Sequence, residues 1–459
     1  MPDSVHRTPP PVEITQVESF GVAPVPDAYR NMGPGMLFLI WALASASATT
    51  PVIGLLLKNV GLTHFVYLVL LATAVGFLPG LLLAHMGRQV PIISMIMARR
   101  TFGMAGATLM ALLYTVVGAG WFGLNTDVGG RILDSLFPGY GLTWYLLLGA
   151  LQIGLVFFGM EVLEKFYKYT AVLFLLCYAV LTWYLFSRYA FTLPVADGAV
   201  PWGRDIDLIL SFSLLAWAYD FPTVTRFCTP WVPGEAMSRS LQYAAMPALG
   251  VMSAVLFMGI LGLVALEMTG DWNIALLGKE LPVWGEISAV GVILAIAHTN
   301  AMNLYPAVTK LLAVVNVAER QSPAWLQPLV VISLGCFSTL LAILGILNVI
   351  EGFLNVLGEL LFPFTFILVV DWFHGRYYRM PAAQFYPGGR GAPKVWSWPA
   401  LWALFALLLA IGMDQMVGAW IPASWQPALP WQVLSALLAA LLYGAGLLLW
   451  GKTWTWEVA

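Results

Sequence analysis

Apolar segments long enough to cross a lipid bilayer fill most of this chain, and they decide what it can fold into. A transmembrane helix needs about 20 predominantly apolar residues. We find twelve such segments, at residues 33–57, 62–84, 103–136, 140–160, 166–190, 207–229, 240–268, 285–317, 325–348, 351–373, 398–418 and 430–450. Only 10% of the residues are charged, whereas soluble domains carry about 25%. We therefore predict an all-α integral membrane protein with twelve transmembrane helices.

A polar, proline-rich segment, residues 1–32, precedes the first predicted span. It lacks a basic start followed by a short apolar core, so we interpret it as a disordered cytoplasmic tail and not as a signal peptide. With this tail inside, 16 of the 21 Lys and Arg residues fall on the inner side. Those assigned to inner loops include Arg88, Arg99, Arg100, Arg226 and Lys310. The positive-inside bias then predicts a multi-pass protein of the inner (plasma) membrane with both termini in the cytoplasm.

Two of the predicted helices are interrupted. In span 1, small and hydroxylated residues run from Ser45 into Pro51, and in span 6 the stretch from Ala216 runs into Pro222. Proline removes a helical hydrogen bond and clashes with the preceding turn. Within a bilayer such a break is tolerated only where it is buried in protein or lines a wet cavity.

The two breaks lie five spans apart, so the second set of five spans would be inserted upside down relative to the first. Broken helices at matching places in inverted halves indicate a transporter binding site, whereas ordinary proline kinks are the alternative. We therefore divide the chain into a first five-helix repeat at 33–190, a second, inverted repeat at 207–373, and two extra C-terminal helices at 398–450.

Ionisable and amide side chains occur inside several predicted spans, although a charge at mid-bilayer costs about 2.5–3.5 kcal/mol on insertion scales. They are Asn125, Asp127, Asp220, His298, Asn300, Asn303, Glu359 and Asp414. Asn300 and Asn303 are three residues apart and so share one face of span 8. We interpret these groups as the lining of a cavity. The alternative is that each makes an ordinary interhelical hydrogen bond.

The sequence lacks the patterns that other functional classes require. Cys177, Cys228 and Cys336 lie far apart in apolar runs without metal-ligand spacing, and we predict buried free thiols. No two of the five histidines share a helix face, and neither a nucleophile motif nor a Walker motif is present. No basic block indicates nucleic acid. We expect a secondary transporter with no cofactor and no enzyme activity, with a channel or a sensor as the alternative.

Five segments together resemble the nucleobase:cation symporter-1 family. They are ARRTFGMAG at 98–106, GAGWFGLN at 118–125, TVTRF at 223–227, HTNAMNLYP at 298–306 and VVDWFHGRYYR at 369–379. The resemblance covers spans 1–10 and implies a LeuT-like five-plus-five inverted repeat. It also implies cation-driven import of a flat nitrogen heterocycle, such as cytosine, uracil, hydantoin, allantoin or a thiamine-type pyrimidine. No protein partner is implied.

The resemblance also implies substrate-binding residues. Trp121 matches the tryptophan of span 3 on which family members stack the substrate ring, and Asn125 stands where an amide binds the substrate in hydantoin-type members. On span 8, Asn300 matches the asparagine of cytosine-type members, and Asn303 is the near match in hydantoin-type ones. Stacking contributes about 1–3 kcal/mol per base in proteins, and amides supply both donors and acceptors for a heterocycle.

Span 6 departs from the family pattern. Alignment on TVTRF places Leu214 where a second stacking aromatic residue is expected. Trp217 and Phe212 are the alternative sources of that ring. A ligand that is bulkier or less planar than a nucleobase would explain the departure.

The same resemblance points to the coupling ion. Sodium-coupled members hold the ion between carbonyls of broken span 1, here around Ala42 and Ser45, and two hydroxyls of span 8. Thr299 keeps one hydroxyl, but His298 replaces the other, and hard cations prefer oxygen ligands. Histidine exchanges protons near neutral pH, so we favour proton coupling through His298, with Asp220 as a second proton carrier or counter-ion. Sodium at Ala42, Ser45 and Thr299 is the alternative.

Overall fold

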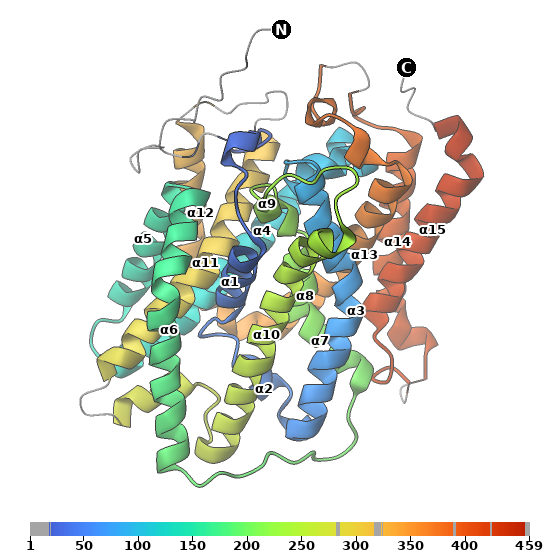
Figure 1. Ribbon diagram of the computed structural model, residues 1–459. Helices are drawn as coiled ribbons and strands as arrows, with labels where there is room; N and C mark the ends of the chain where they lie inside the picture. The colour runs from blue at the N-terminus through green and yellow to red at the C-terminus, as the bar shows by residue number, and fades with distance from the viewer. Residues whose placement is uncertain are drawn as a thin grey trace.

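The computed structural model describes residues 18, 20–280, 285–315, 323, 325–388, 392–422 and 425–454, and this part of the chain is helical without a strand. The α-helices pack side by side as one bundle (Figure 1). They are α1 (Pro34–Ser45), α2 (Val52–Leu56), α3 (Gly61–Gln89), α4 (Ser94–Leu136), α5 (Leu142–Phe157), α6 (Met160–Arg188), α7 (Trp202–Phe212), α8 (Leu214–Ala218), α9 (Phe221–Thr225), α10 (Met237–Thr269), α11 (Gly285–Val315), α12 (Leu326–Ile343), α13 (Ile350–His374), α14 (Trp398–Trp420) and α15 (Trp431–Trp454).

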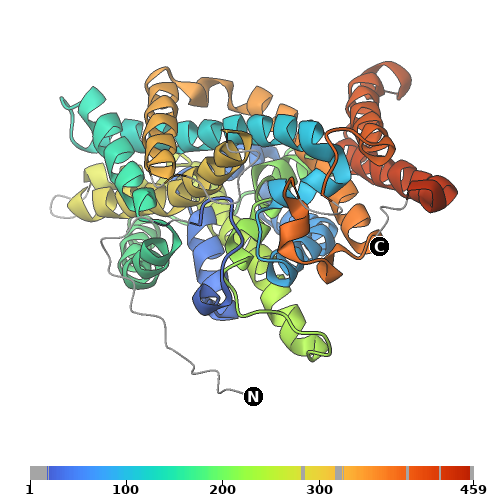
Figure 2. The same ribbon diagram turned by 90° about the horizontal axis from the view of Figure 1, so that it is seen from above.

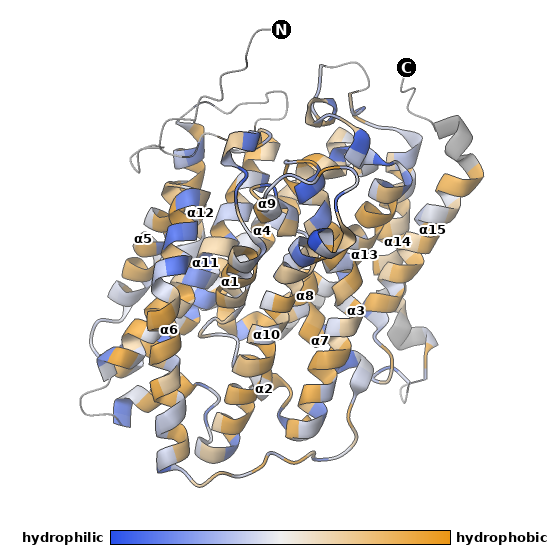
Figure 3. Ribbon diagram, in the orientation of Figure 1, coloured by the Kyte–Doolittle hydropathy of each residue, from blue (hydrophilic) through white to orange (hydrophobic). Residues whose placement is uncertain are grey.

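The predicted spans correspond to these helices in order, and the bundle is apolar along its length (Figure 3). Within the described residues, nine helical segments are long and apolar enough to cross a membrane. Three shorter apolar helices, Pro34–Ser45, Leu142–Phe157 and Trp398–Met413, occupy the places of predicted spans 1, 4 and 11. Length and composition alone therefore support nine of the twelve crossings. Helices α14 and α15 lie together at one edge of the bundle (Figure 2).

Span 1 is broken where the sequence predicts. Helix α1 ends at Ser45, and α2 begins after Pro51, which is the N-cap residue of α2. Both halves rest on α10 through glycines: a Cβ on Gly250 would lie 2.7 Å from the Phe38 carbonyl oxygen, and a Cβ on Gly262 would overlap the Pro51 carbonyl. Glycine is therefore required at these crossings, because any side chain would push the half-helices away from α10.

Span 6 is interrupted twice, once within the predicted stretch and once earlier, at a residue that was not predicted. Its backbone leaves the helix at Ser213, with φ −131° and ψ −100°, between α7 and α8. A second interruption at Tyr219 and Asp220 separates α8 from α9, and Pro222 lies in the first turn of α9. Proline fits the first turn of a helix because its missing N–H has no partner there. Pro222 therefore starts a helix at this position instead of breaking one.

The segment from Phe20 to Met32 is packed against the bundle, in contrast to the disordered tail predicted for residues 1–32. Val22 and Val25 are buried, the N–H of Val25 donates to the Pro91 carbonyl, and Met32 pairs with Cys228 in an isolated bridge. We call residues 18 and 20–32 the N-terminal strap. The face of the molecule on which it lies, at the top of Figure 1, is called the N-terminal face.

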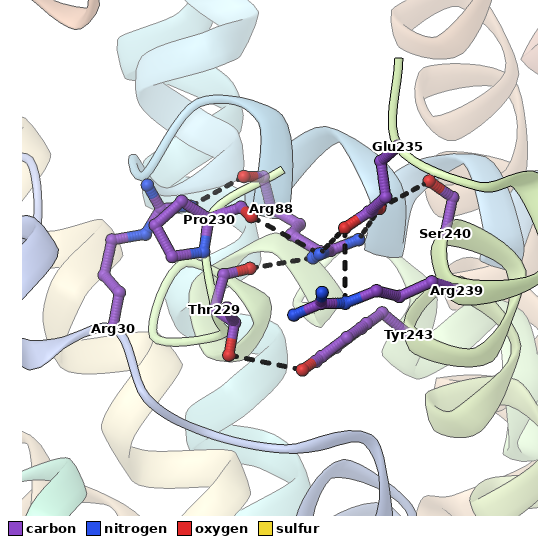
Figure 4. Close-up of polar contacts among 8 residues, drawn as sticks. All are labelled: Arg30, Arg88, Thr229, Pro230, Glu235, Arg239, Ser240 and Tyr243. Carbon is purple, nitrogen blue, oxygen red and sulfur yellow. Dashed lines mark hydrogen bonds and ion pairs between the residues drawn. The ribbon is translucent and has the colours of Figure 1, made fainter. Parts of the chain in front are cut away.

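A buried ion pair anchors one end of the strap (Figure 4). Arg88, at the end of α3, donates two hydrogen bonds of 2.6 Å to Glu235, and Arg30 of the strap donates to the Arg88 carbonyl at 2.6 Å. Arg88 holds the pKa of Glu235 down at about 2, with help from Ser240 and Arg239. Charge-assisted pairs of this geometry are strong, and Glu235 stays ionised at physiological pH. We therefore expect this end of the strap to stay attached under physiological conditions.

The other end of the strap contacts two further helices. Glu18 accepts hydrogen bonds from the N–H of Met160 (2.8 Å) at the start of α6 and from the Tyr305 hydroxyl (2.9 Å) of α11. Arg226 donates to the Gly21 carbonyl and lies 3.7 Å from the Glu18 carboxylate. The strap thus joins α6 and α11 to the segment that follows α9.

Replacing Glu18 by Gln is expected to release this end of the strap. Loss of its charge-assisted hydrogen bonds should speed amide exchange at Phe20–Ala23 about tenfold, which hydrogen–deuterium exchange mass spectrometry would measure. Asp27→Asn is the matched control, because Asp27 is 79% exposed and, among the described residues, pairs only with Arg30 at the anchored end. Equal amide exchange rates in the two variants would contradict the inference that Glu18 holds this end of the strap.

Several basic residues assigned to inner loops are buried in the structure. Arg88, Arg99, Arg100, Arg226 and Lys310 are each at most 2% exposed. Arg99 donates to the Ala313 carbonyl, and Arg100 donates to the Gln384 carbonyl. These cations therefore hold helices together and are not free loop charges. The thiols also differ from expectation in part, since Cys177 and Cys228 are buried but Cys336 is exposed.

Candidate functional site

Trp121 lies on α4 among aromatic rings from two other helices. The rings of Phe212 (α7) and Phe353 (α13) are both 5.5 Å from its ring, at interplanar angles of 89° and 73°. Phe353 approaches closely because residue 120 is glycine: a Cβ there would lie 2.8 Å from the Phe353 ring. The indole Nε1 is buried and has no hydrogen-bond partner among the described residues. The site thus offers a large aromatic face together with an unused donor.

The structure separates the three candidates for a second aromatic residue. Phe212 contacts Trp121 directly and ends α7 at the break in span 6. Leu214 points toward α3, where its side chain lies 2.7 Å from the position of a Cβ on Gly76. Trp217 packs edge-on against Trp41 of α1, with ring centroids 5.5 Å apart. Of the three, only Phe212 is placed beside Trp121.

Asn125 connects the Trp121 region to the break in span 1. Its Oδ1 accepts a hydrogen bond of 2.6 Å from the Ser47 hydroxyl, and its Nδ2 donates to the Trp121 carbonyl at 2.8 Å. Ser47 lies in the non-helical stretch between α1 and α2. The amide therefore fixes the broken backbone of span 1 against α4, one helical turn from the indole.

Asn300 and Asn303 form a hydrogen-bonded pair on α11. Asn303 Nδ2 donates to Asn300 Oδ1 at 3.0 Å, while Asn300 Nδ2 donates to Gln152 Oε1 at 2.7 Å and to the Phe122 carbonyl at 3.0 Å. Asn300 is fully buried, whereas Asn303 retains 4% exposure. Asn300 thus binds α4 and α5 in this structure, and Asn303 is the better placed of the two to meet a ligand.

The candidate sodium ligands have internal partners that leave lone pairs free. The Ala42 carbonyl accepts from the N–H of Ala46 at 2.9 Å, and the Ser45 carbonyl accepts from the Thr50 hydroxyl at 2.5 Å. Thr299 donates its hydroxyl proton to the Ala295 carbonyl. Each of these oxygens keeps acceptor capacity, and α1 packs against α11.

His298 faces α6. Its ring is stacked on Tyr167 at 5.1 Å and lies beside Phe166 and Phe174. The Thr170 hydroxyl lies 2.7 Å from His298 Nε2 and donates to the Phe166 carbonyl. Because that hydroxyl has one proton, we infer that Nε2–H donates to Thr170, which leaves Nδ1 bare.

His298 Nδ1 is buried without a hydrogen-bond partner among the described residues. The hydroxyl of Tyr167 donates to the backbone carbonyl of His298, which fixes this turn of α11 against α6. The imidazole thus presents a single free proton acceptor inside the bundle.

Asp220 forms a buried ion pair with Lys310 of α11. Lys310 Nζ lies 2.8 Å from Asp220 Oδ2, and the two side chains are 1% and 4% exposed. The ammonium also lies 4.4 Å from the centre of the Tyr219 ring. The pair joins the second break of span 6 to α11.

The described residues contain no group of three or more His, Cys, Asp or Glu side chains that could hold a metal ion. The side chain of Asp414 lies outside the described part of the structure.

A comparison with protein families decides the identity of this arrangement. A model of the family described as "Permease for cytosine/purines, uracil, thiamine, allantoin" matches residues 24–427. The chain belongs to the nucleobase:cation symporter-1 family.

Relatives and solved structures agree with this assignment. The hydantoin permease of Microbacterium maritypicum is 26% identical over 420 residues, which cover 85% of this chain and 83% of that protein. YxlA of Bacillus subtilis (strain 168), named as a purine-cytosine permease, is 23% identical over 384 residues, or 79% and 81% of the two chains. The closed form of the symporter Mhp1 with bromovinylhydantoin bound superposes with a TM-score of 0.80 at 19% identity, over 95% of this chain and 96% of the other.

Membership in the symporter family makes this chain a multi-pass membrane transporter and not an enzyme. Its fold is the LeuT-like one, with broken helices in spans 1 and 6.

Several residues at the site were not assigned to it by sequence reasoning. Phe353 lies in an apolar run that has no pattern to distinguish it from lipid-facing positions. Lys310 was assigned to a loop because it lies near the end of span 8. Ser47 stood out only as one of several hydroxylated residues at the break. For these residues the decisive information is the packing of distant helices.

Proposed function

We propose that this symporter imports a flat nitrogen heterocycle into the cell, with the substrate bound beside Trp121 between the breaks of spans 1 and 6. The N-terminal face would then be cytoplasmic and the membrane the plasma membrane, as the positive-inside bias predicts. One observation carries the proposal: a buried indole whose Nε1 has no partner among the described residues is bordered by two aromatic rings. Such a site suits a ring with a carbonyl or ring-nitrogen acceptor at its edge.

Recognition of the heterocycle would combine stacking with a small number of hydrogen bonds. Trp121 supplies the face and its Nε1 a donor, while Asn303 and Asn125 supply amides. A substrate that reaches Asn125 would compete with its bond to Ser47. Substrate binding would thereby be communicated to the broken backbone of span 1.

We further propose that a proton is the coupling ion and that His298 Nδ1 accepts it. The proton count at Thr170 supports a bare Nδ1, and this atom is buried with no hydrogen-bond partner in the described part of the chain. Protonation would create a buried imidazolium, which a nearby carbonyl or carboxylate would have to stabilise. Sodium at Ala42, Ser45 and Thr299 is the second candidate, since their oxygens keep free lone pairs.

Uptake of labelled cytosine, uracil, hydantoin and allantoin into proteoliposomes tests the proposed function. Saturable counterflow of at least one compound is expected, with competition by the others. An absence of counterflow for all flat heterocycles, in protein shown to be folded, would contradict the assignment of substrate class. Conductance without saturation would favour a channel.

His298→Gln is expected to abolish accumulation driven by a proton gradient while counterflow is retained. Glutamine keeps a donor near the position of Nε2 but has no group that titrates. Thr299→Ala is the matched variant for sodium coupling and should leave proton-driven uptake within about twofold. Full accumulation by the His298 variant, or uptake driven by sodium alone at constant pH, would overturn proton coupling.

A further inference from the structure

Asp127 makes a buried set of contacts that the proposed function does not use. It is 1% exposed, and its Oδ1 accepts hydrogen bonds from Arg131 Nε at 2.6 Å and from the Tyr145 hydroxyl at 3.3 Å. Its Oδ2 accepts from the backbone N–H of Leu347 at 3.1 Å. Arg131 in turn donates to Asn348 Oδ1 at 3.2 Å. The carboxylate therefore holds the connection between α12 and α13.

That connection leads directly to the aromatic ring beside Trp121. Helix α12 ends at Ile343, and Gly345, with φ +80°, comes before the short helix Ile346–Val349, which leads into α13. Phe353 lies in the first turn of α13 and contacts Trp121. We call residues 345–353 the connecting segment. The position of its backbone sets where the Phe353 ring lies.

The connecting segment borders a cavity on the side that faces α2. A cavity of about 440 Å³ separates it from α2 and is lined by Val52, Leu55 and Leu56 as well as by Trp272. On its other side it contacts α4 through Asp127 and Arg131. Packing against α2 therefore does not hold the segment. The polar contacts to α4 add to the apolar packing of Ile346, Leu347 and Ile350 against the core.

We propose that Asp127 is a positioning residue that holds Phe353 against Trp121, so that the aromatic border of the substrate site depends on the Asp127–Arg131 pair. This inference rests on the proposed function, because it gives Phe353 a part in substrate binding. Asp127 itself does not contact the substrate. Arg131 balances the carboxylate and adds a second contact to the segment.

A distance measurement tests the positioning role without any substrate. Spin labels are placed at two exposed residues in a chain with Cys336→Ser. Val349 lines the cavity on the side of the connecting segment, and Lys58 follows α2, whose residues line the other side. Asp127→Asn is expected to broaden the distance distribution measured by pulsed electron resonance. Asp134→Asn is the matched control, because Asp134 lies on the same helix and accepts the N–H of Gly141 at 2.8 Å. The distance distribution of the Asp134→Asn variant should match that of the protein without this substitution.

A transport measurement tests the consequence for the site. Asp127→Asn is expected to raise KM about tenfold with Vmax changed less than about twofold, because the remaining amide still shapes the pocket but holds the segment less firmly. Asp127→Glu, which keeps the charge, should recover part of the loss. Phe353→Ala should raise KM to a similar extent.

Arg131→Lys keeps the test decisive if Asp127→Asn does not fold, since Arg131 is 45% exposed and lysine keeps a positive charge beside Asp127 but loses the guanidinium contact to Asn348. It should give a smaller change in the same direction. Unchanged distances and unchanged KM in the folded variants would overturn the proposal. Broadened distances with no transport of any heterocycle would instead contradict the proposed function and leave the contact of Asp127 with the connecting segment in place.

Discussion

Lys310→Met is expected to lower the free energy of unfolding by about 3–5 kcal/mol, because it leaves the Asp220 carboxylate unpaired inside the bundle. The pair is buried on both sides, and removal of one partner of a buried pair costs more than the pair contributes. Thermal unfolding of the purified protein in detergent would measure the change.

The double variant Asp220→Asn/Lys310→Met distinguishes the cost of an unpaired buried charge from the contribution of the ion pair to the free energy of unfolding. Removal of both charges should recover most of the loss, since no uncompensated charge remains. Lys165→Met is the matched control, because the Lys165–Glu161 pair has a similar distance of 2.7 Å but is 45% and 49% exposed. Its effect should stay within about 0.5 kcal/mol. A double variant as unstable as the sum of the singles would contradict this account.

Trp121→Ala is expected to weaken binding of the heterocyclic substrate about 5- to 150-fold, the range that corresponds to the loss of one stacking face. Trp121→Phe keeps a smaller face but removes the Nε1 donor, which has no partner in the described structure. Its affinity should therefore fall between those of the alanine variant and the unmodified protein. Binding is measured by isothermal titration or by inhibition of labelled uptake.

The control for this prediction is a tryptophan away from the site. Trp183 lies on α6 and is 67% exposed, so Trp183→Ala should leave the dissociation constant within about twofold. If the two alanine variants bind equally well, the substrate does not stack on Trp121.

The helical architecture was predictable because its cause is local. Twelve apolar runs predict helices in a bilayer, where the backbone must satisfy its own hydrogen bonds. The break in span 1 was predictable as well, since small residues followed by Pro51 mark it. The break at Ser213 carries no glycine or proline beside it, so the sequence pattern pointed to Pro222 instead. There the proline opens a helix.

The candidate site was predictable only in part. Trp121 belongs to a recognisable segment, and its burial beside Phe212 agrees with a site there. The orientation of His298 toward α6 and of Asn300 toward α4 and α5 depends on which helices pack together. Lys310 and Phe353 were missed for the same reason. A residue's position along one helix does not state which neighbour it meets.

The glycine contacts of α10 bear on how span 1 behaves during transport. Gly250 meets α1, while Gly262 and Gly259 meet α2 and the residues at its start. The continuous helix α10 therefore supports both α1 and α2, the two pieces of interrupted span 1. We therefore expect α1, α2 and α10 to move together when access changes sides, so that the non-helical stretch at 46–51 does not act as a hinge.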